Sequence, residues 1–156
     1  MKKAFLFFIA IVVSTSLSAC NLNKVAPMDE LDEDGKFYYQ NKELGFKVKF
    51  PDTFIYYQVQ RKDTEEYKQI EFYVPSSDSN YPQEIQSYVK PITVRVYNES
   101  AWEDYDKKVY VEDIYTSLGN NGGKKYFVLF WGERPKDWRD KWNNEIQNEI
   151  LNSFEF

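Results

Sequence analysis

The 156-residue sequence contains 25 Asp and Glu residues and no His, and this inventory limits the reactions that its side chains could catalyse. Ser-His-Asp and Cys-His nucleophilic sites need an imidazole, so both are excluded. A hydrolase built on two carboxylates remains possible in principle, because it needs only two acids whose surroundings separate their pKa values. Glu66, Glu71 and Asp104 are candidates, but in so acidic a chain we interpret each as solvated surface charge. We therefore predict no catalytic residue.

A short acidic run has part of the spacing of a calcium loop. Glu30, Asp32 and Asp34 stand at positions 1, 3 and 5, with Gly35 at position 6. The pattern fails at position 12, where Asn41 replaces the bidentate Glu, and Glu30 replaces the usual first Asp. We interpret the run as a hydrated spacer and predict no metal site and no cofactor.

The sequence is rich in aromatic residues, with 13 Tyr and 4 Trp, and such rings serve both sugar binding and protein interfaces. Trp138 and Trp142 fall on an apolar helical stripe and Trp131 in an apolar strand, which indicates core packing for all three. The predicted binding residues are Tyr56, Tyr57, Tyr81, Tyr88, Tyr97 and Trp102, and the five tyrosines among them are predicted to be exposed. The sequence does not separate glycan binding from protein binding.

The first nineteen residues have the composition of a secretory signal. Lys2 and Lys3 precede an apolar run over residues 4–13 and a Ser-rich end. Ten apolar residues form a helix of only about 15 Å, roughly half of a bilayer's hydrocarbon core, so a permanent span is not expected.

The end of this segment carries a more specific signal. The string Leu17-Ser18-Ala19-Cys20 resembles the bacterial lipobox. The resemblance implies cleavage between Ala19 and Cys20 and attachment of palmitate-type acyl chains to Cys20, a lipid anchor sufficient for stable membrane attachment. Because Cys20 is the only Cys, its acylation also excludes thiol catalysis, thiolate zinc sites and disulfides. Asn21 is not the Asp associated with inner-membrane retention, so the expected location is the cell membrane or outer membrane, facing the periplasm or the exterior.

The charge balance of the mature chain disfavours nucleic acid as a partner. Loss of residues 1–19 removes Lys2 and Lys3 but no acid, which leaves 18 basic and 25 acidic residues and a net charge of −7. Binding to polyanions needs a basic face. We divide the chain into a signal peptide at 1–19, a lipidated Cys and acidic tether at 20–36, and one globular domain at 37–156.

The domain has mainly the period-2 apolar pattern of strands. Strands are predicted over residues 37–39, 46–50, 54–60, 69–74, 92–97, 109–118 and 125–131. The segment 126–131 is apolar on both faces, which predicts a sheet covered on both sides. A helix is predicted after the N-cap Asp137, with an apolar stripe from Trp138 and Trp142 to Phe154. A short helix is predicted from the capping box at Ser100, and a helical turn within 83–87.

Three segments together resemble a known family. The string at 44–54, the strand containing Tyr126 and the closing residues 149–156 are similar to the PsbP-like domains of bacterial lipoproteins, although Phe54 stands where the family commonly has Trp. The resemblance implies an α+β fold, a three-layer α/β/α sandwich around an antiparallel sheet. Members that bind metal through His cannot lend that property to a chain without His.

These observations favour a non-enzymatic binding or assembly module, held on a lipid bilayer through Cys20, that contacts an envelope protein partner. Two alternatives stay open: a carboxylate-based cell-envelope glycan hydrolase, and a lipoprotein that binds glycan without turnover.

Overall fold

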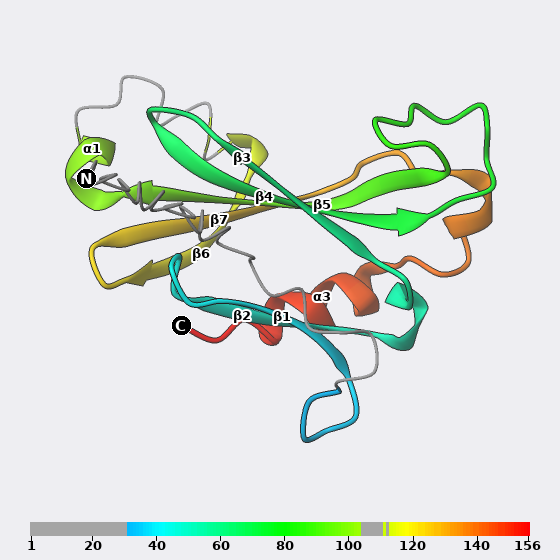
Figure 1. The fold of residues 1–156 in the computed structure, drawn as a ribbon, viewed down its shortest axis with the longest axis horizontal. Coiled ribbons are helices and arrows are strands. Elements are labelled where there is room, and N and C mark those ends of the chain that lie inside the picture. The colour runs from blue at the N-terminus through cyan, green and yellow to red at the C-terminus, as the bar shows by residue number, and fades with distance from the viewer. Residues whose placement is uncertain (1–30, 104–110, 112) are drawn as a thin grey trace, which may run out of the picture.

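Alternating apolar side chains produce the first two strands of the fold. In β2 (Phe46–Phe50) the side chains of Phe46, Val48 and Phe50 are buried, whereas Lys47 and Lys49 lie on the opposite face. β2 pairs antiparallel with β1 (Phe37–Asn41) in a two-stranded sheet. The computed structural model describes residues 31–103, 111 and 113–156, and in that part of the chain the fold is α+β and dominated by antiparallel sheet (Figure 1).

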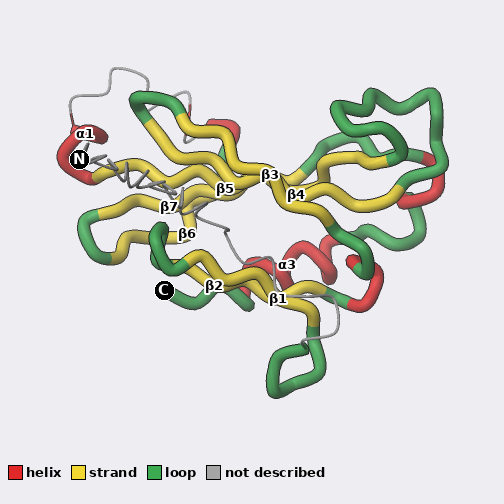
Figure 2. The backbone as a smooth tube through the Cα atoms, viewed as in Figure 1, coloured by secondary structure: helices red, strands yellow, loops and turns green. Residues whose placement is uncertain are grey.

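A second, larger sheet contains five strands in the order β3-β4-β5-β7-β6, and every neighbouring pair is antiparallel. The strands are β3 (Gln58–Asp63), β4 (Tyr67–Pro75), β5 (Tyr88–Asn98), β6 (Thr116–Asn121) and β7 (Lys124–Phe130). Figures 1 and 2 show the β1–β2 hairpin and α3 (Asn144–Asn152) on one side of this sheet.

Hydrophobic side chains cover both faces of the five-stranded sheet. The main core lies between the sheet, the hairpin and α3, and Tyr126 and Val128 of β7 belong to it. A second cluster on the opposite face combines Phe127 of the same strand with Trp102 of α1 (Glu99–Glu103) and Tyr115. Successive residues of β7 therefore enter different clusters, which confirms the prediction of a strand buried on both faces.

The C-terminal helix is shorter than the apolar spacing predicts. Trp138 ends a 3-10 helix, η2 (Lys136–Trp138), and α3 begins only at Asn144. The prediction that Asp137 caps the long helix is wrong, because the extended Asn143 is the N-cap and accepts a hydrogen bond from the Ile146 amide at 2.9 Å. The four-residue spacing of Trp138 and Trp142 arises because both rings enter the same core, where each lies about 6 Å from Phe54.

Three local predictions also differ from the structure. Residues after Pro51 form the 3-10 helix η1 (Asp52–Phe54), so β3 starts at Gln58 rather than Phe54. Residues 113 and 114 are helical and β6 starts at Thr116. Residues 83–87 are not helical; Ile85 bridges to Tyr88 at the start of β5 instead.

The acidic stretch before β1 belongs partly to the folded domain. The carboxylate of Asp32 lies 2.7 Å from the Lys47 ammonium and 2.6 Å from that of Lys49. Hydrogen bonds from both lysines hold the pKa of Asp32 at about 2. These contacts join Asp32 to the β1–β2 hairpin. The signal peptide, Ala19, Cys20 and the tether to residue 30 lie outside the described residues.

Candidate functional site

Buried polar side chains gather on the face of the five-stranded sheet that is turned away from the hairpin. Gln69 and Glu71 of β4 and Thr93 of β5 are buried there, whereas Ile70 and Phe72 point into the main core. In the register of the two strands, Glu71 pairs with Thr93. Buried polar groups in the middle of a sheet need hydrogen-bond partners.

Glu71 is the centre of the cluster and is only 1% exposed. Its carboxylate lies 2.7 Å from the Lys62 ammonium and 2.9 Å from that of Lys90. The Tyr73 hydroxyl and the Gln69 side-chain amide donate to it at 2.7 and 2.8 Å. Four donors thus offset the cost of burying this charge. The prediction that Glu71 is solvated surface charge is wrong.

A second carboxylate shares the same donors. Glu84 lies 2.7 Å from Lys62, accepts from the Tyr73 hydroxyl at 3.1 Å and pairs with Lys90. Hydrogen bonds from the two lysines hold the pKa of Glu84 at about 2. Burial acts to raise the pKa of Glu71, but its hydrogen bonds outweigh burial and the pKa lies below its ordinary value.

This electrostatic arrangement is unsuited to hydrolysis by a carboxylate pair. Such a mechanism needs one carboxyl group with a raised pKa that can donate a proton near neutral pH. Glu71 and Glu84 are both ionised at neutral pH and both are occupied by lysines. Of the other sequence candidates, Glu66 is exposed and Asp104 lies outside the described residues. The cluster is a charge-balanced structural unit.

A pocket of about 280 Å³ opens beside this cluster. Its lining residues are Tyr73, Tyr81, Pro82, Gln83, Glu84 and Lys90. Tyr81 is half-buried, donates its hydroxyl to the Glu133 carbonyl at 2.9 Å and packs edge-on against Trp131. The pocket therefore combines an aromatic wall with paired charges.

At the other end of the cluster, Gln69 connects Glu71 to Arg95. The Gln69 side-chain nitrogen donates to Glu71, and its oxygen accepts from Arg95 Nε at 2.7 Å. The guanidinium carbon of Arg95 lies 4.3 Å from the ring centre of Tyr67 and 4.5 Å from that of Tyr115. Arg95 is held between two aromatic rings, a favourable cation–π geometry.

Three of the six predicted aromatic binding residues, Tyr57, Tyr97 and Trp102, are buried, so the prediction that Tyr57 and Tyr97 are exposed is wrong. The Tyr57 hydroxyl donates to the Tyr38 carbonyl at 2.6 Å, which fixes that ring inside the main core. Tyr97 and Trp102 pack on each other and on Phe127 in the second cluster. For Tyr97, strand alternation did not reveal the burial because the second cluster covers that face of β5.

The other three rings reach the surface to different degrees. Tyr81 and Tyr88 are half-buried, whereas Tyr56 is 55% exposed and follows Ile55, which is 44% exposed. Tyr56 also has a φ of 65°, a left-handed conformation that is uncommon and strained for an aromatic residue. We call Ile55 and Tyr56 the apolar tip. The strain was not visible in the sequence.

Buried neighbours hold this tip rigidly. Phe54, directly before it, is fully buried and stacks on Phe50 with ring centres 5.0 Å apart. Tyr57, directly after it, is held by its hydrogen bond to Tyr38. An exposed apolar pair with anchored ends and a strained backbone is a candidate contact point.

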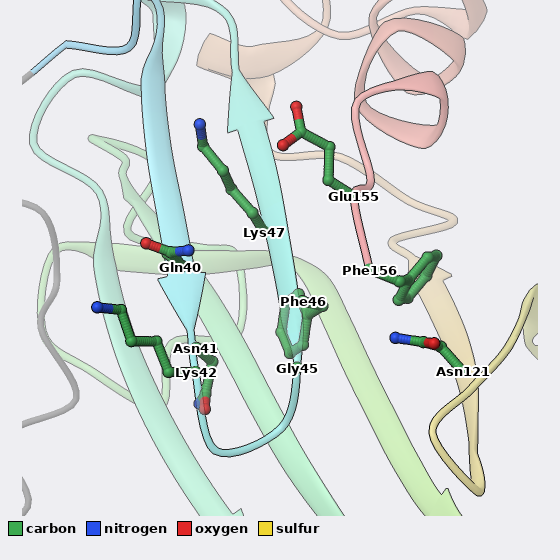
Figure 3. Close-up of a pocket in the computed structure, with 9 residues that line it drawn as sticks. All are labelled: Gln40, Asn41, Lys42, Gly45, Phe46, Lys47, Asn121, Glu155 and Phe156. Carbon is green, nitrogen blue, oxygen red and sulfur yellow. The ribbon is translucent and has the colours of Figure 1, made fainter.

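Figure 3 shows a second hollow, of about 320 Å³, between the β1–β2 turn, the end of β6 and the last residues. The turn relies on Gly45, whose φ of 79° and 3.4 Å approach to the Tyr126 hydroxyl both disfavour a side chain. Lys47, which lines the hollow, is already paired with Asp32. Because the Lys47 ammonium is paired with a carboxylate outside the hollow, the hollow has no second cluster of paired charges like the one around Glu71.

The remaining sequence predictions concern metals, membranes and lipid. Asp32 and Asp34 of the calcium-like run contact Lys49 at 2.6 and 3.0 Å. Within residues 31–103, 111 and 113–156, no group of three acids could hold a metal, and no helix has the length and hydropathy to cross a bilayer.

No protein-family model, curated protein or solved structure matches the chain.

Proposed function

We propose that this chain is an exported lipoprotein whose domain acts as a non-enzymatic binding or assembly module on the cell envelope. The observation that carries the proposal is the string Leu17-Ser18-Ala19-Cys20 directly after a short apolar run. Cys20 bears the acyl chains and anchors the protein in the cell membrane or outer membrane. The domain faces the periplasm or the exterior.

The charge cluster supports a binding role over a hydrolytic one. Glu71 and Glu84, the two carboxylates that lie together beside a pocket, both have lowered pKa values and both bind Lys62 and Lys90. Neither has the raised pKa of a general acid.

The position of the tether suggests how the domain is presented. Asp32 contacts Lys47 and Lys49 on the outer face of the hairpin, whereas Phe46 and Val48 of the same strand face the main core. Glu71 lies on the face of β4 opposite Ile70 and Phe72, which belong to the main core, so its cluster is turned away from the hairpin that Asp32 contacts. The eleven residues between Cys20 and Asp32 reach at most about 40 Å.

The apolar tip is the proposed contact with an envelope protein partner. Ile55 and Tyr56 together expose a rigid apolar surface whose ends are already ordered, so binding would cost little additional conformational entropy. Tyr is also enriched in the contact residues of protein interfaces.

For the fold, we propose the three-layer PsbP-like arrangement. Support comes from the hairpin and α3 on one face of the sheet and from Trp102, Val111 and Tyr115 on the other. An experimental structure of the mature protein tests it, and a second face without a helical layer over residues 99–115 would contradict it.

Site-specific crosslinking in intact cells tests the binding role. A photoreactive amino acid at position 56 should capture one predominant envelope protein, and the same group at Asn120, an exposed residue of β6, should not. Equal capture at both positions, or none at position 56, would contradict the proposal. Wall-glycan turnover by the purified protein that a Glu71→Gln change abolishes would favour the hydrolase instead.

One observation favours glycan binding as a second candidate. Tyr81 forms a wall of the 280 Å³ pocket and packs on Trp131, whose fluorescence would report a bound sugar. A saturable change in Trp fluorescence with wall-derived sugars, lost in Tyr81→Ala, would support this candidate. Unchanged fluorescence with every sugar would exclude it.

A further inference from the structure

The hollow between the β1–β2 turn, the end of β6 and the last residues has the size of a small-molecule site (Figure 3). Its volume of about 320 Å³ lies at the lower end of the range of such sites, which is roughly 300 to 1,000 Å³. Its lining residues, all within the described part of the chain, are Gln40, Asn41, Lys42, Gly45, Phe46, Lys47, Asn121, Glu155 and Phe156. The hollow is large enough for a sugar ring but too small for the contact surface of a folded protein.

Aromatic rings gather on one side of the hollow. The ring centre of Phe156 lies 4.6 Å from that of Tyr126 and 6.4 Å from that of Phe154. Phe156 nevertheless remains 48% exposed, so an apolar surface faces water at the edge of the hollow. The carbon–hydrogen face of a sugar ring can pack on such a surface, because the face of an aromatic ring carries partial negative charge. A bound sugar would also remove apolar area of Phe156 from water.

Asn121 supplies a hydrogen-bonding group next to this ring. Figure 3 shows its side chain beside the Phe156 ring and directed toward Phe46. The side chain is exposed and forms no hydrogen bond with the described part of the chain. The β6–β7 turn does not need it either, because Gly122 and Gly123 supply positive φ values of 57° and 73°. The amide of Asn121 can therefore donate to and accept from the hydroxyl groups of a ligand.

The charged side chains of the hollow do not create a site for an ion. The Lys47 ammonium pairs with Asp32. The Glu155 carboxylate lies 3.7 Å from the Lys49 ammonium. Lys42 is exposed, and Figure 3 shows its ammonium turned away from the aromatic rings. The groups beside those rings are uncharged, which favours a neutral ligand.

Hydrogen bonds fix the walls of the hollow relative to one another. The Tyr126 hydroxyl and the Lys124 ammonium of β7 both donate to the Leu44 carbonyl, at 2.7 and 3.3 Å. These bonds join β7 to the hairpin turn. The backbone groups of Lys47 and Glu155 exchange hydrogen bonds of 2.8 and 2.9 Å, which join the last residues to β2. A ligand would meet walls that are already ordered, so binding would cost little conformational entropy.

We propose that this hollow binds a neutral sugar residue of a glycan. Phe156 packs on the face of the sugar ring, and the Asn121 amide binds its hydroxyl groups. The site is separate from the pocket of about 280 Å³ that Tyr81 lines. The inference goes beyond the proposed contact with an envelope protein, and it needs neither the lipid anchor nor the apolar tip.

NMR titration of the whole mature chain, residues 20–156, tests the site. Cys20→Ser removes the acylated side chain, so the protein needs no detergent whose sugar headgroups could compete. The probes are tri-N-acetylchitotriose and maltotriose as neutral sugars and glucuronate as a charged one. At least one neutral trisaccharide should shift the Asn121 side-chain amide and Phe156 ring signals in a saturable way. It should bind about tenfold more tightly than glucuronate, whose charge would lose hydration without a partner.

Three variants separate the hollow from its surroundings. Asn121→Ala should weaken binding of that trisaccharide about fivefold, because hydrogen bonds are lost. Phe156→Ala should weaken it about tenfold, because the packed ring is lost. Asn120→Ala, at the exposed neighbouring residue that does not line the hollow, should leave the affinity unchanged.

The signal shifts decide the question even if Phe156→Ala does not fold. Unshifted Asn121 and Phe156 signals with both neutral sugars, equal affinity for glucuronate, or unchanged affinity in folded Asn121→Ala would overturn the proposal. Shifts confined to Tyr81 and Trp131 would also overturn it, because they would place the sugar in the other pocket. None of these outcomes alters capture at position 56, so failure of this proposal and failure of the proposed binding function are distinguishable.

Discussion

The buried carboxylate of Glu71 lies 2.7 Å from the ammonium group of Lys62, whose side chain is 46% exposed. The pair joins β4 to the edge strand β3, and Lys90 of β5 binds the same carboxylate from the other side. The buried Glu71 carboxylate on β4 therefore forms ion pairs with both neighbouring strands, β3 and β5, on the face opposite the main core. Its contribution to stability can be measured directly.

Glu71→Gln should lower the free energy of unfolding by about 1 to 3 kcal/mol, because the amide cannot balance two lysines that remain in place. Urea denaturation followed by circular dichroism measures the loss. Glu65→Gln, at an exposed position on the β3–β4 turn, should change stability by less than about 0.5 kcal/mol. Equal effects of the two changes would mean that the Glu71 cluster does not stabilise the fold.

The same cluster should make stability fall in acid. The folded-state pKa of Glu71 is lowered and that of Glu84 is about 2, whereas both would titrate near their ordinary value of 4.5 when unfolded. Their stabilising contribution is therefore complete above about pH 4.5 and is lost as the pH falls toward 2. Urea midpoints between about pH 7 and pH 3 should show this loss, and the loss should be smaller in Glu71→Gln. An identical acid dependence in both proteins would disprove the assignment.

Tyr56→Gly should raise the stability of the domain while it removes partner capture. Glycine adopts a φ of 65° without the steric cost that Tyr56 bears, so we expect a gain of about 0.5 to 1 kcal/mol. Ser87, with a φ of 64°, provides the matched control: Ser87→Gly should give a similar gain and leave capture by a probe at Ile55 intact. Loss of stability in Tyr56→Gly would show that the ring serves the fold rather than a partner.

Asp32→Asn should release the start of the folded domain without unfolding the rest. The change removes the charge that contacts Lys47 and Lys49. Hydrogen–deuterium exchange should become faster for residues 32–36 and remain unchanged in β4 and β5. High salt should have the same effect on the unaltered protein, because ion pairs near the surface are screened. Unchanged exchange at 32–36 would show that other contacts hold this segment.

Local patterns located β2 and β7 well, whereas the predicted starts of β3 and β6 were too early. The alternation of Phe46, Val48 and Phe50 located β2, and the apolar residues on both faces of β7 predicted a sheet covered on both sides. The C-terminal helix was predicted too long because Trp138 and Trp142 have helical spacing but enter the core from a 3-10 helix and an extended turn. Spacing alone does not distinguish these cases.

The sequence did not predict the candidate site because its chemistry arises from contacts between residues that are far apart in the sequence. The ionised, buried state of Glu71 depends on Lys62 and Lys90, which lie 9 and 19 residues away. The cation–π contacts of Arg95 likewise depend on Tyr67 and Tyr115, which come from separate segments. The exposed Tyr56 was predicted, but its left-handed backbone was not, because an aromatic residue in a sequence gives no sign of a positive φ.

We propose that a lipid-anchored polypeptide begins at Cys20, and mass spectrometry of the native protein from isolated membranes tests this proposal most directly. The N-terminal peptide should begin at Cys20 and carry the added mass of two or three acyl chains, and Cys20→Ser should abolish both cleavage and that added mass. A native chain that starts at Met1, or an unmodified thiol at position 20, would contradict the anchor and the envelope function that depends on it.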